Sequence, residues 1–204
     1  MKQKNTRYAL LACSALFSLS VATGASAAAV TDSCVSCHGV DGANSTADVP
    51  NIGGYSATYI TASLKSFKKK ERPCVVATVE TGAKKGTKTD MCQVANGMSD
   101  ADVKQVSDFF AGKPFVRTAN AFDAAKAAQG KTHFKSCDGC HSEGGSVPDD
   151  DAGILAGQKT AYIAEQIKLF QGGKRPIPKK MKAKLDLMDA TAIDQIINYL
   201  ASEK

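Results

Sequence analysis

Two short segments of this chain combine two cysteines and a histidine at the same spacing. They are Cys34-Val35-Ser36-Cys37-His38 and Cys137-Asp138-Gly139-Cys140-His141. Two thiols three residues apart on a helical turn can each add to one vinyl group of a haem, and the next imidazole then reaches the iron. The pattern predicts two covalently bound haem c groups. The expected thioether cysteines are Cys34, Cys37, Cys137 and Cys140, and the expected iron ligands are His38 and His141.

Other uses of a single segment of this kind are a disulfide or half of a zinc site. A zinc site needs four ligands, and the only histidine outside the two segments is His133. Two segments at corresponding places in a repeat therefore favour haem. His133 lies four residues before Cys137, so a second histidine ligand for that haem is a further alternative. We favour the simpler interpretation, an exposed histidine on a helix.

The chain is a tandem duplication. Residues of matching type recur at a constant separation of 103 positions over more than thirty residues. The matching pairs are Cys34 and Cys137, Gly54 and Gly157, Tyr59 and Tyr162, Ile60 and Ile163, Leu64 and Ile167, and Phe67 and Phe170. The apolar members are spaced as on one face of a helix, so each half is expected to bury a helix at this point.

After that helix the separation falls to 90 positions, so the first half has 13 extra residues. Met91 then matches Met181, and Ser99 matches Asp189, the expected N-caps of a final helix in each half. Residues 113–119 directly follow Gly112, contain the helix breaker Pro114 and lack periodicity. We expect an all-α fold with a first domain at 28–112, a linker at 113–119 and a second domain at 120–204.

The N-terminal residues resemble a secretory signal. Basic residues precede an apolar stretch that is followed by small residues, so cleavage is expected before Ala28 and the signal peptide at residues 1–27. A membrane anchor is disfavoured because the apolar stretch is shorter than the roughly 20 residues that span a bilayer. A lipoprotein signal ending at Cys13 would leave the small-residue site unexplained. The expected location is the periplasm.

Loss of the signal changes the charge balance. The whole chain has a formal charge of +6, and residues 1–27 hold three basic residues and no acidic residue, which leaves +3. Four haem propionates would offset this remainder. Nucleic acid is therefore a poor candidate partner, and no membrane span is expected in the mature chain.

Cys74 and Cys92 are the two cysteines left after the haem segments and the signal are set aside. Both lie at the edges of the stretch in which the first half is longer. In an oxidising compartment they are expected to form a disulfide beside Met91. The alternative is that one of them binds the first haem iron as a thiolate.

Each half resembles a class I cytochrome c domain, with a helix leading into CxxCH, a middle helix, a methionine loop and a final helix. In that family the second axial ligand is a methionine eight residues before the Ser or Asp that opens the last helix. The resemblance therefore implies Met91 and Met181 as ligands, with Met98 and Met188 as alternatives that the family usually replaces with apolar packing residues. It also implies two domains related by a pseudo-two-fold axis.

Two dihaem families share this architecture, cytochrome c4 and the cytochrome subunit of flavocytochrome c sulfide dehydrogenase. The second half resembles the latter in Ile154-Leu155-Ala156-Gly157-Gln158, in Arg175-Pro176 and around Met181. This resemblance implies that the chain accepts electrons from an FAD-containing sulfide dehydrogenase flavoprotein and passes them to a downstream cytochrome or oxidase. The runner-up is a free c4-like carrier to a terminal oxidase.

Neither resemblance makes the chain an enzyme by itself. It contains no G-x-G-x-x-G fingerprint for a dinucleotide, so chemistry on sulfur is expected on the partner. A peroxidase or a thiosulfate dehydrogenase would need an open or unusually ligated iron, and it remains a third hypothesis. His/Met ligation at both irons predicts an electron relay, because it raises the reduction potential and leaves no open position for substrate.

Overall fold

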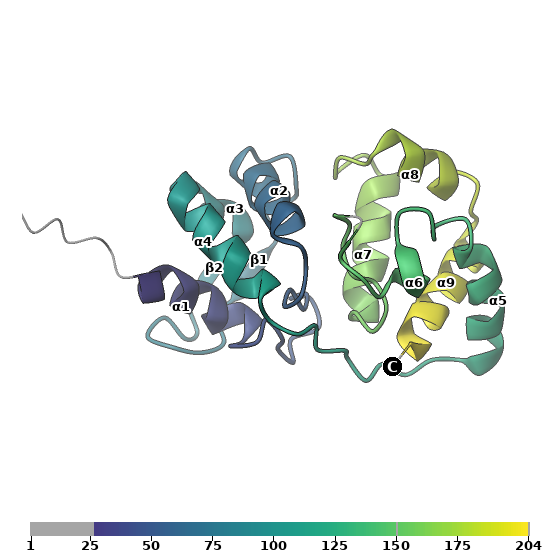
Figure 1. Ribbon diagram of the computed structural model, residues 1–204, viewed down its shortest axis with the longest axis horizontal. Helices are drawn as coiled ribbons and strands as arrows, with labels where there is room; N and C mark the ends of the chain where they lie inside the picture. The colour runs from purple at the N-terminus through teal and green to yellow at the C-terminus, as the bar shows by residue number, and fades with distance from the viewer. Residues whose placement is uncertain (1–26, 150, 204) are drawn as a thin grey trace, which may run out of the picture.

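The computed structural model describes residues 27–149 and 151–203, which form two lobes joined by one extended segment (Figure 1). The first lobe contains α1 (Ala27–His38), α2 (Ala57–Lys68), β1 (Val76–Thr78), β2 (Lys88–Asp90), α3 (Met91–Asn96) and α4 (Asp100–Ala111). The second contains α5 (Ala124–Phe134), α6 (Ser142–Gly145), α7 (Thr160–Gln171), α8 (Lys179–Leu185) and α9 (Ala190–Ser202). Residues 1–26 of the predicted signal peptide lie outside the described range.

The helices confirm the predicted all-α fold and the duplication. α2 and α7 begin and end 103 positions apart, and α4 and α9 begin 90 positions apart. Loop hydrogen bonds repeat as well: the Gly54 amide donates to the Phe110 carbonyl at 2.9 Å, and the Gly157 amide donates to the Leu200 carbonyl at 2.9 Å. None of the described helices is long and apolar enough to cross a membrane.

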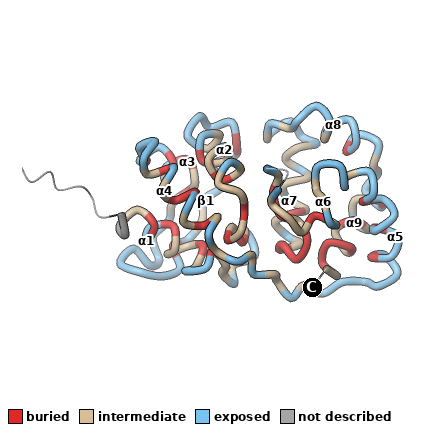
Figure 2. The backbone as a smooth tube through the Cα atoms, viewed as in Figure 1, coloured by how far each residue is buried: buried red, intermediate tan, exposed pale blue. Residues whose placement is uncertain are grey.

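Each lobe has its own core, and the buried stretches of the backbone lie inside the lobes and along the loops that face between them (Figure 2). The first core surrounds the fully buried Phe110, and the second surrounds Phe134 and Leu200. The final helices begin at the predicted caps. The Ser99 hydroxyl accepts from the Asp102 amide, and the Asp189 carboxylate accepts from the Ala192 amide.

The 13 extra residues of the first half contribute a short antiparallel hairpin. β1 pairs with β2 so that Val76 lies opposite Asp90 and Thr78 opposite Lys88. The loop between the strands reaches back to the first CxxCH segment, where the amides of Glu80 and Thr81 donate to the Ser36 carbonyl at 3.2 and 3.1 Å. The first haem segment is therefore covered by a hairpin that has no equivalent among the described residues of the second half.

The segment that connects the lobes forms hydrogen bonds with both of them. The predicted linker, residues 113–119, lies within the non-helical stretch between α4 and α5. The Asn51 side-chain amide donates to the Val116 carbonyl at 2.8 Å, and the Thr118 amide donates to the Gly157 carbonyl at 2.7 Å. Gly54 has a φ of +75°, and a Cβ there would lie 2.8 Å from the Phe115 amide nitrogen. The segment therefore holds the lobes in a defined placement.

Candidate haem sites

The first CxxCH segment forms the C-terminal end of α1. Cys34 and His38 are buried, and Cys37 is partly buried. The helix stops here because Gly39 adopts a left-handed φ of +80°, which turns the chain so sharply that a Cβ would lie 1.9 Å from the Ala43 carbonyl oxygen. The sequence thus places both thiols on one helical turn and the imidazole at its end.

His38 has the environment of a metal-binding imidazole. Its Nδ1 lies 3.0 Å from the Pro50 carbonyl oxygen, which can only accept a hydrogen bond. Nδ1 therefore carries the proton, and Nε2 keeps the lone pair that a metal requires. Burial lowers the pKa of His38 to about 4, so the ring is neutral at neutral pH.

The first thiol of each segment is also held in its neutral form by burial. Burial raises the pKa of the Cys34 thiol to about 11, and burial likewise raises the pKa of Cys137. A thioether carries no charge, so haem attachment at these positions replaces one neutral group with another.

The second CxxCH segment lies just beyond α5 and forms turns. The Cys137 amide donates to the Phe134 carbonyl at 2.7 Å, and the His141 amide donates to the Cys137 carbonyl at 3.0 Å. The hydrogen bond from His141 to Cys137 closes a single helical turn. His141 therefore lies one turn beyond Cys137, which is the spacing that attachment of one haem requires. His133 is exposed on α5, as the simpler interpretation expects.

The methionines occupy different surroundings. Met91 is the first residue of α3, whose N-cap Asp90 accepts from the Gln93 amide at 2.9 Å, and it is partly buried against the first core. Met98 is buried within that core, where a packing residue belongs. Met181 lies in α8 and is partly buried, whereas Met188 packs against the second core.

The structure joins Cys74 and Cys92 in a disulfide across a sequence separation of 18. It ties the start of the hairpin segment to α3, one residue beyond Met91. Neither sulfur is a thiolate in this state, so the alternative of thiolate ligation has no free sulfur among these two residues.

We expect the double substitution of Cys74 and Cys92 with serine to lower the free energy of unfolding of the first domain by about 3 kcal/mol, because an open chain gains loop entropy on unfolding. Urea unfolding followed by circular dichroism measures the change. The second domain has no such pair among its described residues, so its transition is the internal control. An unchanged first transition contradicts the prediction.

Equivalent residues of the two lobes meet at a local two-fold axis. Tyr55 and Gln158 occupy corresponding positions of the repeat, and the Gln158 side-chain amide donates to the Tyr55 hydroxyl at 2.8 Å. The Tyr55 hydroxyl donates to the Ile154 carbonyl at 3.1 Å, and Gln158 donates to the Asn51 carbonyl at 2.7 Å. Ile154 and Asn51 are themselves equivalent, so each lobe contacts the other through the same part of its fold.

A second pair of reciprocal contacts joins each of α2 and α7 to an arginine that follows the other helix, and the two helices face one another in Figure 1. Arg72 donates to the Tyr162 hydroxyl at 3.2 Å, and the equivalent Arg175 donates to the Tyr59 hydroxyl at 3.3 Å. Each guanidinium also lies over a phenylalanine of its own lobe, at 4.2 and 4.4 Å from the ring centroid.

Three cationic side chains at the interface between the lobes bear on whether the site suits haem. Arg72 and Lys159 are buried, and Arg175 is half-buried. Within the described residues, none of the three has a carboxylate within 4.0 Å. Buried charge is costly without a counter-charge, so the interface suits an anionic group. Haem supplies two propionates, and the neutral His38 supplies an iron ligand, so the residues present fit the group.

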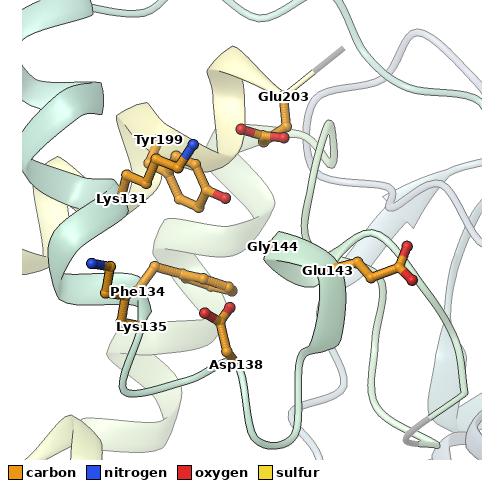
Figure 3. Close-up of a pocket in the computed structure, with 8 residues that line it drawn as sticks. All are labelled: Lys131, Phe134, Lys135, Asp138, Glu143, Gly144, Tyr199 and Glu203. Carbon is orange, nitrogen blue, oxygen red and sulfur yellow. The ribbon is translucent and has the colours of Figure 1, made fainter.

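A surface cavity of about 290 Å³ lies beside the second CxxCH segment (Figure 3). Its lining consists of Lys131, Phe134, Lys135, Asp138, Glu143, Gly144, Tyr199 and Glu203. The Phe134 and Tyr199 rings lie among charged side chains from α5, from α6 and from the residues that follow α5 and α9. A largely charged lining does not match the apolar face of a porphyrin, so we assign this cavity no role in haem binding.

The fold and these sites define a small haem protein with two similar domains, and known proteins share that design. The family profile of cytochrome c matches residues 21–112. Cytochrome c-554(548) of Halomonas halodenitrificans is 31% identical over 39% of this chain and 83% of its own length. The chain belongs to the cytochrome c family.

Three comparisons extend over both lobes. Cytochrome c4 of Stutzerimonas stutzeri is 29% identical over 82% of this chain and 84% of its own. A thiosulfate dehydrogenase electron acceptor of Thiomonas intermedia is 28% identical over 79% and 73%. The structure of Acidithiobacillus ferrooxidans cytochrome c4 superposes with a TM-score of 0.65 at 25% identity, over 84% of this chain and 99% of that one.

Within the family, the chain is thus of the cytochrome c4-like, two-haem type. It carries covalently bound haem c, and its function is electron transfer. The predicted tandem class I domains are confirmed. The interface cations were not predicted from the sequence, although Arg72-Pro73 and Arg175-Pro176 stand at equivalent positions of the repeat, which is a signal of a shared role.

Proposed function

We propose that this chain is a periplasmic electron relay with one haem in each lobe. Thioethers form at the four CxxCH cysteines, and His38 and His141 are the proximal iron ligands. Met91 and Met181 complete the two iron sites. Haem held by these residues would supply one-electron redox chemistry, and saturated His/Met ligation would exclude substrate from the iron.

The observation that carries this proposal is the reciprocal interface. Tyr55 and Gln158 meet at the local axis, and Arg72 and Arg175 each contact the opposite lobe. Contacts repeated in this way fix the distance and orientation of two sites, which electron exchange between them requires. A pair of carriers on a flexible linker would need neither the buried hydrogen bonds nor the pinned connection.

The proposed donor and acceptor differ between two candidate roles. The full-length similarity to cytochromes c4 favours a free carrier that docks transiently on its partners. The second-half segments, from Ile154 to Gln158 and at Arg175-Pro176, favour a subunit that receives electrons from an FAD-containing sulfide dehydrogenase. In either role, the exposed Lys179, Lys180 and Lys182 of α8 can steer an acidic redox partner.

A pull-down from the native periplasm separates the two roles. We expect the mature chain, matured with haem, to contain two low-spin haems per polypeptide. As a free carrier it elutes without flavin and is not reduced by sulfide. Flavin absorbance that co-elutes at low and high salt, with haem bands that reduce on addition of sulfide, instead establishes the flavoprotein subunit. One haem per chain, or none, contradicts both.

A further inference from the structure

Lys159 is a buried cation that crosses from the second lobe into the first. It directly precedes α7, yet its side chain forms no hydrogen bond that caps this helix. Its Nζ instead donates to the Asn44 side-chain oxygen at 2.9 Å, to the Thr46 carbonyl at 2.7 Å and to the Val49 carbonyl at 2.6 Å. All three acceptors belong to the loop that follows the first CxxCH segment.

This loop is the one that holds His38. Lys159 binds the carbonyl of Val49, and the next carbonyl, that of Pro50, accepts from Nδ1 of His38. The ammonium therefore acts on the surroundings of the first proximal ligand from the opposite domain.

Within the part of the chain that the structure describes, the residue equivalent to Lys159 is not a cation. Ser56 occupies the position equivalent to Lys159 in the repeat, and its hydroxyl accepts from the Tyr59 amide as an ordinary N-cap. A serine carries no charge and stays within its own helix. The repeat is thus asymmetric here: at these two equivalent positions, Lys159 brings a charge to the loop of the opposite lobe and Ser56 does not.

We propose that Lys159 raises the reduction potential of the first haem relative to that of the second haem. A residue of the second domain thus adjusts the potential of the haem in the first domain. A fixed positive charge in a poorly screened environment favours the reduced state of a nearby haem, because reduction removes one positive charge from the iron. Lys159 is held by the loop from Asn44 to Pro50 and acts by its charge, not as an iron ligand. The inference rests on the proposed haem attachment at Cys34 and Cys37.

The test is a spectroelectrochemical titration of both haems in the two-haem protein, with each potential assigned by proton NMR contacts between haem and domain residues. We expect Lys159→Met to lower the potential of the first haem by several times the change at the second. Lys159→Gln keeps a hydrogen-bond donor without the charge, and we expect the same fall. Lys159→Arg restores the charge and should restore the potential.

The matched control is Lys104→Gln, which removes an exposed lysine of the first domain. The proposal is overturned if both potentials stay unchanged in Lys159→Gln, if they fall equally, or if Lys104→Gln gives the same shift. Haem content measured on the same samples separates this failure from that of the proposed function, because a chain without two haems contradicts the latter before any potential is compared.

Discussion

Substituting leucine for Met181 or for Met91 is expected to open the iron of one domain and leave the other unchanged. Leucine has the bulk of methionine but no lone pair, so the iron loses its sixth ligand. Its spin state should change from low to high, and the reduced form should bind carbon monoxide at that site alone. The potential of the altered haem should fall, because the thioether stabilises ferrous iron.

Low-temperature electron paramagnetic resonance of the oxidised protein measures the spin change, and a carbon monoxide titration counts the open sites. The matched controls are Met98→Leu and Met188→Leu, since these methionines pack against the two cores and leucine preserves their volume. Both controls should keep two low-spin haems. If Met98→Leu opens an iron and Met91→Leu does not, the ligand assignment in the first domain is reversed.

The local part of this fold could be predicted because its signals lie close together in the sequence. The CxxCH spacing identifies the haem segments, and the constant separation between halves identifies the duplication. The caps Ser99 and Asp189 mark the start of the last helices, and both form the expected hydrogen bonds. Each inference used residues within one or two helical turns of each other, where side-chain type decides conformation.

The interface could not be predicted in the same way. Lys159 bonds with Asn44 across a sequence separation of 115 residues, and Arg72 with Tyr162 across 90. A lysine before a helix normally remains in solvent, so nothing local distinguishes Lys159. The hairpin after α2 could not be predicted for another reason. Each of its strands has three residues, which is too short for an alternating pattern of polar and apolar residues to appear.

The contact between α5 and α9 is equally non-local, and it gives the second large prediction. The two helices cross so closely at Gly130 that a Cβ there would lie 1.9 Å from the Gln195 carbonyl oxygen and 2.9 Å from the Ile196 amide nitrogen. These are backbone atoms, so a rotamer change cannot make room for a methyl group. Gly130→Ala must push the helices apart.

We expect Gly130→Ala to lower the free energy of unfolding of the second domain by about 2 kcal/mol, because overpacking outweighs the better helix propensity of alanine. The first domain should unfold as in the original protein. Thermal unfolding followed by circular dichroism and by haem absorbance resolves the two transitions. Lys131→Ala is the control in the same helix, since the side chain of Lys131 is exposed.

The reduction potential of the second haem should also change in Gly130→Ala. The rings of Phe134 on α5 and Tyr199 on α9 lie 5.3 Å apart, and the Cys137 amide donates to the Phe134 carbonyl. A displacement of α5 therefore moves the start of the second CxxCH segment, and we expect the potential of the second haem to change in Gly130→Ala while that of the first stays constant. An unaltered second transition together with an unaltered second potential would show that α5 and α9 do not pack this closely.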